Sequence, residues 1–470
     1  MLAGITGLLG AITIAETWTE ERELVSRIMY TTDRSTTEED LQRLLSDEEL
    51  GQLQLTTLSY YLHESNPVNG LVRDKTDPKA PSSIAATGFA LASVPVLVER
   101  GVISREFAPE LVLKRLRFFR DSPHGPQPKA TGYRGFYYHF LDIKTGRRVW
   151  QCELSTIDSA FLFAGMLTCA AYFDGDTEEE TELRRLADEL YCRADWEWAT
   201  NGGPAISHGW RPETGFIPHY WTGYDEALLV YLLALGSPTF PLPPESYTAY
   251  CSTYSWKQIY GRELLYSGPL FTHQLSHLWI DFRDLRDEFM REHDSDYFEN
   301  SRQATYVHQE YARRNPLEFE GYGEFCWGIT ATDGPGWEKR VVKSVERQFY
   351  DYYARGAPFG PDDGTVAPWV VVASLPFAPE IVIPTARSLA GVELGGKHRP
   401  YGFRCSFNQT FRMDDSPSGW WVTPYQFGID QGPVVLMIEN YRTGLIWNLM
   451  RRCPYVVAGL RRAGFTGGWL

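Results

Sequence analysis

Residues 155–173 read STIDSAFLFAGMLTCAAYF, and this stretch decides the fold class. After Asp158 it is apolar on nearly every side, whereas a helix at a protein surface keeps a polar face. The stretch therefore predicts a helix buried inside the protein. Residues 179–198, EETELRRLADELYCRADWEW, have charged residues opposite an apolar stripe, which predicts an outer helix packed on the buried one.

The same alternation extends along the chain in both directions. A buried helix is predicted at 82–101, ending near Gly101, and Thr37 with Asp40 resembles a helix N-cap pattern. Further helices are predicted over 35–65, 223–236, 270–285, 301–315, 378–392 and 432–452. Strand signals are fewer: a hairpin is predicted around Lys144–Gly146, and residues 321–336 and 401–428 read as long aromatic loops.

No Pro-, Ser- or Gly-rich linker divides the chain, so we expect one all-α domain over residues 19–470 with a few short strands and decorated loops at one end. An α/α toroid of paired helices and an irregular α-solenoid both fit this pattern. Residues 1–18 are apolar, which is typical of a signal-like segment or of an N-terminal segment packed on the fold. We expect a periplasmic or secreted monomer that does not enter a membrane.

Composition narrows the class of ligand. The formal charge is −15 at pH 7, which argues against nucleic acid or anionic lipid as the partner and suits a neutral ligand. The chain has 15 Trp, 27 Tyr and 25 Phe residues, which either fill a large core or line a cleft for flat apolar faces such as those of sugar rings. The seven cysteines form no CxxC pair, so we expect most of them to be buried, reduced and inert.

Acidic residues next to aromatic residues are candidates for glycosidic bond cleavage, which needs two carboxyl groups on either side of the bond. Glu226 follows Trp221 and Tyr224 where a loop enters an apolar helix, and partial burial there would raise its pKa and suit a general acid. Asp430 precedes a Gly-Pro helix entry in apolar surroundings. The alternative is that both residues only stabilise helix N-termini.

Two further acidic segments fit the same pattern. Asp158 begins the buried helix, with Glu153 just before it, and a charge there is unfavourable unless it is paired or functional. Glu299 lies beside Tyr297 and Asn300, whose amide suits a sugar hydroxyl. Helix capping explains each segment equally well.

A metal or nucleotide site is not predicted. His273, His277 and Asp281 would share one helical face, but the sequence lacks the glutamate of an HExxH motif and no further ligand is evident, so we expect cleft lining or hydrogen-bonded helix contacts. GxSxG, P-loop and GxGxxG motifs are absent from the sequence.

Taken in order, several long segments resemble the bacterial glycoamylase-like family that includes the endo-β-1,2-glucanases, glycoside hydrolase family 144. The segments run from about residue 55 to the C-terminus: NPVNGLVRD (66–74), IAATGFAL (84–91), RGFYYHFLDIKTGRR (134–148), ELSTIDSAFLFAG (153–165), GWRPETGFIPHYWTGYDEALLVYLLALGSPT (209–239), LFTHQLSHLWIDFRD (270–284), DYFENSRQAT (296–305), WGITATDGP (327–335), DDGTVAPWVVVASLPFAPE (362–380) and GIDQGPVVLMIENYRTGLIW (428–447).

The resemblance implies an (α/α)6 toroid that hydrolyses β-1,2-glucan without a cofactor or a metal, with Glu226 as the general acid and Asp430 as the base. It implies other acidic cleft positions at Glu153, Asp158 and Glu299. We expect the substrate to contact Trp221, Tyr224, His277, Tyr297, Asn300, Trp327 and Asp363. Cys405 stands where many relatives are expected to have an acidic residue.

Alternatives remain within this family and outside it. An exo-acting, sophorose-releasing hydrolase or a transglycosylase would differ in its product sizes. A non-catalytic glucan-binding protein would release no reducing ends, and an α-1,4-glucan hydrolase would cleave maltooligosaccharides instead.

Overall fold

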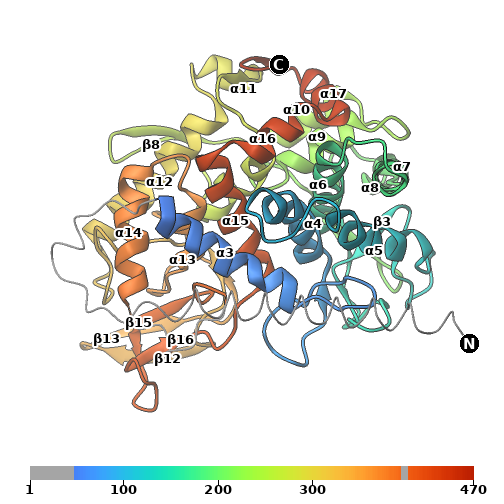
Figure 1. The fold of residues 1–470 in the computed structure, drawn as a ribbon. Helices are drawn as coiled ribbons and strands as arrows, with labels where there is room; N and C mark the ends of the chain where they lie inside the picture. Colours follow the sequence, from blue (N-terminus) through green and yellow to red (C-terminus); the bar gives the residue numbers. More distant parts are fainter. Residues whose placement is uncertain (1–46, 393–400) are drawn as a thin grey trace, which may run out of the picture. The chain divides into compact units, whose positions relative to one another are not determined.

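Helices make up most of the regular structure in the computed structural model, which describes residues 47–392 and 401–470 (Figure 1). The described residues belong to a unit that begins at Leu45. The predicted boundary after residue 18 and the predicted cap at Thr37 and Asp40 therefore lie outside the described residues. The α-helices are α3 (Asp47–His63), α4 (Ile84–Glu99), α5 (Ala108–Asp121), α6 (Thr156–Tyr172), α7 (Glu178–Cys192), α8 (Trp196–Ala199), α9 (Leu228–Gly236), α10 (Pro244–Cys251), α11 (Glu288–Glu292), α12 (Tyr297–Arg314), α13 (Pro368–Ala373), α14 (Pro379–Gly391), α15 (Gly428–Arg442), α16 (Leu445–Met450) and α17 (Pro454–Arg462).

The strands are short, as predicted. They are β1 (Ser82–Ser83), β2 (Gly132–Tyr133), β3 (Phe136–Tyr138), β4 (Phe140–Leu141), β5 (Leu154–Ser155), β6 (Gly209–Arg211), β7 (Gly215–Phe216), β8 (Trp256–Ile259), β9 (Arg262–Leu265), β10 (Leu285–Arg286), β11 (Ala331–Thr332), β12 (Glu338–Val342), β13 (Val345–Phe349), β14 (Tyr353–Ala354), β15 (Phe407–Arg412), β16 (Trp420–Val422) and β17 (Thr466–Gly467). The predicted hairpin at Lys144–Gly146 is confirmed by an antiparallel bridge between Leu141 and Arg148.

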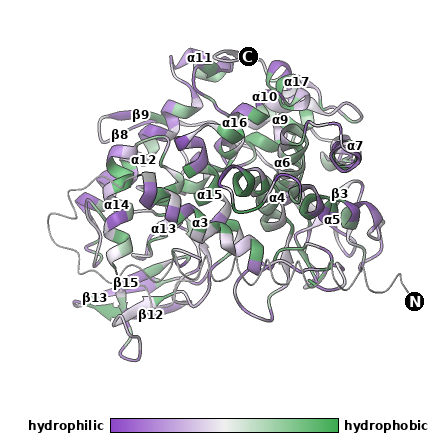
Figure 2. Ribbon diagram, in the orientation of Figure 1, coloured by the Kyte–Doolittle hydropathy of each residue, from purple (hydrophilic) through white to green (hydrophobic). Residues whose placement is uncertain are grey.

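The apolar helices lie inside the fold, and the predicted buried helix at 155–173 is confirmed as α6. Every residue of α9 is buried, and α4 and α6 are apolar along most of their length (Figure 2). Glycines let α4 and α6 approach closely. A Cβ on Gly88 would lie 2.5 Å from the carbonyl oxygen of Phe161, and one on Gly165 would lie 2.1 Å from that of Gly88, so neither position has room for a side chain.

The buried helices pack against one another in pairs. α6 packs on α4 and α9, while α15 packs on α4 and α13. The segment 270–278 lies between α9 and α13 and is hydrogen-bonded toward both. Ser276 Oγ donates to the carbonyl oxygen of Glu226 before α9 at 3.1 Å, and Gln274 Nε2 donates to the carbonyl oxygen of Val370 in α13 at 2.7 Å.

The α-helix predicted over 270–285 is wrong in type. The chain there forms two short 3₁₀ helices, η1 (Leu270–His273) and η2 (Leu275–Leu278), separated by Gln274. Gln274 is fully buried, and besides its bond to α13 its amide donates to the Oγ of Ser374, the residue that follows this helix, at 2.7 Å. These buried hydrogen bonds of the Gln274 side chain stabilise a backbone path that differs from a continuous α-helix. The spacing of apolar residues along the sequence does not reveal such bonds.

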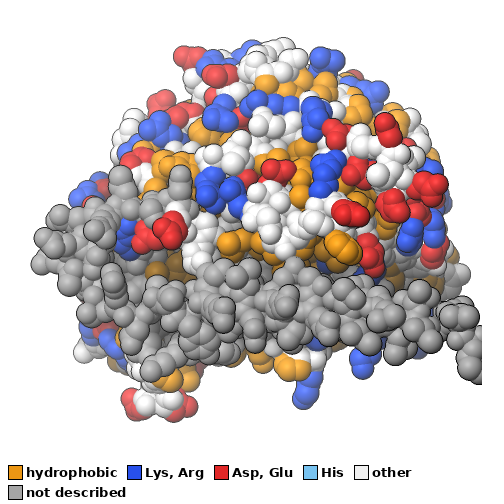
Figure 3. Space-filling model, viewed as in Figure 1, with side chains coloured by type: hydrophobic (Ala, Val, Ile, Leu, Met, Phe, Trp, Pro, Cys, Tyr) orange, Lys and Arg blue, Asp and Glu red, His pale blue; other side chains and the backbone are white. Residues whose placement is uncertain are grey.

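Polar helices lie outside the apolar ones. α7 packs on α5 and α6, and α17 packs on α9. The outer helix predicted over 179–198 is confirmed as α7, although α8 follows it as a separate turn. Acidic and basic side chains are interspersed on the face drawn in Figure 3. Among residues 47–392 and 401–470, no helix combines the length and the apolar character that a membrane crossing requires.

A five-stranded antiparallel sheet, in the order β2-β3-β5-β6-β7, positions one end of the inner helices. Its strand β5 leads directly into α6, and Ser155, at the junction, is the N-cap of that helix. The sheet therefore fixes where the first turn of α6, and with it Asp158, enters the fold.

Candidate active site

A cavity of about 450 Å³ lies where several inner helices begin. Its acidic lining comes from the first turns of α6 and α15, from Glu226 shortly before α9, and from two loops. The carboxyl groups are those of Asp74, Asp158, Glu226, Asp333 and Asp430. Aromatic walls surround them, made by Phe140, Phe161, Phe271, Tyr352, Trp369 and Phe427. Acids between aromatic walls form the kind of cleft that a sugar ring fits.

Glu226 is held where the loop after Tyr224 enters α9. Its carbonyl oxygen accepts from Ser276 Oγ, which fixes the backbone beneath the side chain. Burial, assisted by the negative charge of Asp225, raises the pKa of Glu226 to about 8. The carboxyl group is therefore protonated at neutral pH, which is the state that a general acid needs.

Asp430 lies in the first turn of α15 and is 5% exposed. Its Oδ2 has no hydrogen-bond partner among the described residues. Burial raises its pKa well above the usual range, and the charges of Asp333 and Asp74 act in the same direction, while a hydrogen bond from Cys405 opposes them. Asp430 thus presents an acceptor oxygen that a water molecule or a substrate hydroxyl would satisfy.

His139 links the acidic residues at the start of α6. Its Nδ1 lies 2.8 Å from Glu153 Oε1, and its Nε2 lies 3.7 Å from Asp158 Oδ2. Although burial disfavours the charged ring, the charges of Asp158, Glu153 and Asp74 raise the pKa of His139 to about 9. Burial opposes ionisation of Glu153, but its bond to His139 lowers its pKa to about 2. Glu153 is therefore a partner of His139, which itself lines the cavity, and is not part of the cavity lining.

Sequence reasoning missed Asp74, His139, Asp333 and Tyr352 as members of this cavity. Asp74 ends the segment NPVNGLVRD and Asp333 lies in the loop ITATDGP. An acid in a Gly- and Pro-containing loop beside an apolar run was the available signal. Burial raises the pKa of Asp74 to about 6 and also raises that of Asp333.

The aromatic residues predicted to stack on sugars lie in the core instead. The indole N–H of Trp221 donates to Thr156 Oγ1 at 3.0 Å, and that of Trp327 donates to Thr385 Oγ1 at 2.9 Å. Tyr224 and Tyr297 are buried. Large rings are common in protein cores, and the structure buries these four residues there.

The polar residues predicted to bind substrate are also engaged elsewhere. Asn300 accepts from the N–H of Leu265 at 2.6 Å, which joins β9 to α12, and His277 Nε2 lies 3.0 Å from Ser301 Oγ. Asp363 forms a fully buried ion pair with Arg355, with oxygen–nitrogen distances of 2.7 and 2.8 Å.

Glu299 is placed outside the cavity as well. It lies in the first turn of α12, where its carboxylate contacts Arg302 and Gln303 on the same helix. The N-cap of this helix is Asp296, so Glu299 and Asn300 both lie in the opening turns of α12.

The helical face that would have joined His273, His277 and Asp281 does not form, because the segment is not an α-helix. Asp281 pairs with Arg283 and Arg451. Burial lowers the pKa of His273 to about 4 and that of His277 to about 3. Within the described part of the chain, no group of three or more His, Cys, Asp or Glu side chains is arranged to hold a metal ion.

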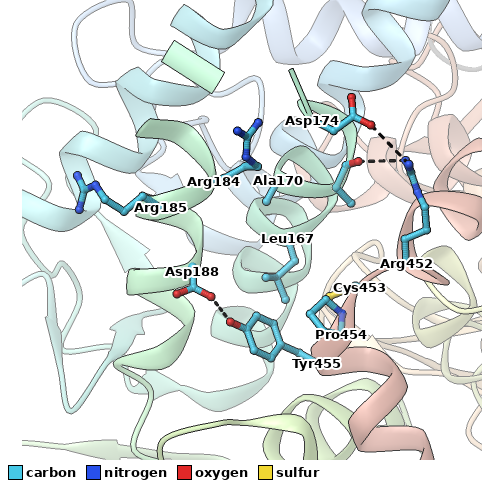
Figure 4. A pocket seen from close by; sticks show the side chains of 11 residues that line it. Leu167, Ala170, Asp174, Arg184, Arg185, Asp188, Arg452, Cys453, Pro454 and Tyr455 are labelled. Carbon is cyan, nitrogen blue, oxygen red and sulfur yellow. Dashed lines mark hydrogen bonds and ion pairs between the residues drawn. The ribbon is translucent and has the colours of Figure 1, made fainter. Parts of the chain in front are cut away.

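A second hollow, of about 520 Å³, lies near the other end of α6, between α7 and the start of α17 (Figure 4). Its carboxylates are already paired. Asp188 accepts from the hydroxyl of Tyr455, and Asp174 lies 3.6 Å from Arg452. We therefore place the candidate chemistry in the cavity at the start of α6.

Buried acids between aromatic walls in a helical fold are typical of the sites of glycoside hydrolases. A family model described as "Putative glucoamylase" matches residues 218–454, about half of the chain, and the chain belongs to this glycoamylase family. The predicted resemblance is confirmed.

Individual relatives agree with this assignment. The chain is 30% identical over 457 residues to an exo β-1,2-glucooligosaccharide sophorohydrolase (non-reducing end) of Parabacteroides distasonis, covering 89% of the chain and 58% of that relative. It is 32% identical to the crystal structure of a putative glucoamylase from Bacteroides uniformis, with a TM-score of 0.79, covering 91% of the chain and 100% of that structure. It is 27% identical to an endo-β-1,2-glucanase from Chitinophaga pinensis in a sophorotriose and glucose complex, with a TM-score of 0.78, covering 91% and 100%.

Proposed function

We propose that this protein hydrolyses β-1,2-linked glucan as an endo-β-1,2-glucanase. The observation that carries the proposal is the cavity in which Glu226 and Asp430, from different inner elements, line one space with aromatic walls. The names of the relatives from Parabacteroides distasonis and Chitinophaga pinensis support the choice of substrate.

In the proposed mechanism, Glu226 protonates the glycosidic oxygen and Asp430 activates water. The raised pKa of Glu226 supplies the proton at neutral pH. Asp430 has an unpartnered oxygen that accepts from the water, and it works as a base in the fraction of molecules in which it is ionised. His139 holds Asp158 and Glu153 beside the same space.

We also propose that the inner elements close into the inner ring of an (α/α)6 toroid. The contacts α4–α6, α6–α9, α13–α15 and α15–α4 support a closed order. Between α9 and α13, Ser276 of η2 accepts from the N–H of Leu229 in α9, and Gln274 donates to Val370 in α13. In such a ring the starts of the inner helices share one end, which is where the acidic cavity lies.

Exo action with release of sophorose is a second candidate, favoured by the name of the relative that is 30% identical. The experiment incubates the protein with linear β-1,2-glucan, with soluble starch and β-1,3-glucan in parallel, and sizes the products at early times. Activity confined to β-1,2-glucan with a ladder of products supports the endo proposal, and sophorose alone supports exo action. Cleavage of starch but not of β-1,2-glucan would refute both.

A further inference from the structure

Trp150 is a large side chain in an exposed position beside the wall of the acidic cavity. It is 66% exposed. The centroid of its ring lies 5.2 Å from that of Phe140. Phe140 lines the cavity and stacks on the ring of His139, with 3.9 Å between the two ring centroids. The aromatic surface of the cavity wall therefore continues outward through Phe140 to Trp150.

The backbone that presents Trp150 is in an unfavourable conformation. Trp150 has φ 56° and Gln151 has φ 51°, and the N–H of Cys152 donates to the carbonyl oxygen of Val149 at 3.1 Å. Positive φ at both central residues of such a turn is normally supplied by Asn and Gly, because a larger side chain is strained there. A side chain of this size in this turn is a local violation of sequence preference, which natural proteins tolerate mainly at functional sites.

One other pair of consecutive non-glycine residues with positive φ occurs among the described residues. Lys343 and Ser344 form the tip of the β12–β13 hairpin, and ladder hydrogen bonds of that hairpin stabilise their conformation. The turn at Trp150 lies between β4 and β5, which do not pair with each other. A regular hairpin therefore does not explain why this turn carries Trp150.

Neighbouring groups hold the turn in place without covering the ring. Phe140 accepts from the N–H of Val149 at 3.2 Å, and the guanidinium of Arg148, itself paired with Glu213, donates to the carbonyl oxygen of Cys152 at 2.6 Å. These hydrogen bonds hold the backbone of the turn, while the indole ring of Trp150 stays largely exposed. Stability of the fold does not account for a tryptophan at this position.

We propose that Trp150 is an outer sugar-binding platform, on which a glucosyl unit outside the acidic cavity stacks while the scissile bond lies between Glu226 and Asp430. The proposal rests on the proposed function, since it names an additional subsite for the same substrate. The apolar face of a pyranose ring matches the exposed face of an indole. Substrates long enough to reach Trp150 would gain affinity from it, and the shortest cleavable substrates would not.

The test compares Trp150→Ala and Trp150→Phe with the wild-type protein on β-1,2-gluco-oligosaccharides of increasing length and on the polymer. Phe107→Ala is the matched control, since Phe107 is a 61% exposed aromatic residue at the start of the outer helix α5. We expect Trp150→Ala to lower kcat/KM on long substrates about five- to tenfold, mainly through KM. The shortest cleaved oligosaccharide should be processed at the wild-type rate, and Trp150→Phe should retain most of the long-substrate advantage.

The outcomes separate this proposal from the proposed function. An equal loss on all substrate lengths, or no loss on any, would overturn the subsite while leaving the glucanase proposal intact. A wild-type protein that neither cleaves nor binds β-1,2-glucan in affinity electrophoresis would overturn both. If it binds without cleaving, weaker retardation of Trp150→Ala than of Phe107→Ala would support the subsite alone.

Discussion

Replacing Glu226 with glutamine tests the proposed mechanism and the electrostatics of the cavity together. Glutamine keeps the size and hydrogen-bonding capacity of the protonated side chain but has no proton to transfer. We expect kcat on β-1,2-glucan to fall by at least about a hundredfold, which is the usual contribution of a positioned acid. The fold should remain intact, because the carbonyl oxygen of Glu226, which the backbone supplies, keeps its bond from Ser276.

The same variant should be more stable than the wild-type protein at alkaline pH. The pKa of Glu226 is raised from 4.5 to about 8, so the folded protein binds this proton more tightly than the unfolded chain does. The resulting stabilisation is complete below pH 4.5 and is lost as pH rises through about 8. Each pKa unit corresponds to about 1.4 kcal/mol, which sets a ceiling of about 5 kcal/mol. Because the side chain lies at the wall of an open cavity, we expect about 1–3 kcal/mol.

Thermal melting of the two proteins between pH 4.5 and pH 9 measures this difference. The melting temperatures should coincide at the acidic end, and Glu226→Gln should melt higher at the alkaline end by about 3 °C. Glu299→Gln is the matched control, since Glu299 is a half-buried acid on α12 outside the cavity, and it should follow the wild-type profile in both activity and melting. Parallel profiles for the wild-type protein and Glu226→Gln would refute the raised pKa. Retention of more than a tenth of the activity would refute the role as acid.

Three other substitutions probe the site and the fold. Asp430→Asn should lower kcat at least about a hundredfold with an unchanged circular dichroism spectrum, and near-normal turnover would exclude Asp430 as the base. Asp363→Asn should destabilise the fold by about 3–5 kcal/mol in chemical denaturation, because it leaves the fully buried guanidinium of Arg355 without its charge partner, and a loss of activity without a loss of stability would contradict this structural role. Gly88→Ala should lower the melting temperature, at a cost of about 1–3 kcal/mol, because its Cβ would meet the backbone of α6 at 2.5 Å; an unchanged melting temperature would show that α4 and α6 are packed less tightly.

The inner helices were predictable from the sequence because burial leaves a direct trace in it. A run such as 155–173 has no polar face, and the structure buries it as α6. The segment 270–285 has apolar residues at helical spacing between its polar ones, and it failed as an α-helix prediction. Its backbone is decided by Gln274, whose partners lie about a hundred residues away in α13. Contacts at such separations leave no local pattern.

The acidic half of the site was more predictable than its walls. Charges next to long apolar runs are costly unless they serve a purpose, and this rule located Asp158, Glu226 and Asp430, which all line the cavity. Aromatic residues carry no such signal, since rings are equally suited to cores and to clefts. Proximity along the chain to Glu226 led to Trp221, which the fold turns into the core, whereas Tyr352 reaches the cavity from a distant loop.

Helix capping and a place in the cavity were weighed as alternative roles for these acids, and the structure shows that the two roles do not exclude each other. At α6, Ser155 Oγ accepts the N–H of Asp158 and donates to the carboxyl group of Asp158, which also lines the cavity. Before α9, Asp225 accepts a backbone N–H at 2.9 Å, and Glu226 next to it lines the cavity. At α15, Asp430 lies in the first turn with one oxygen unpartnered. Helix N-termini favour negative charge, so inner helices that begin around one space would gather carboxyl groups there, whether or not a neighbouring residue caps the helix.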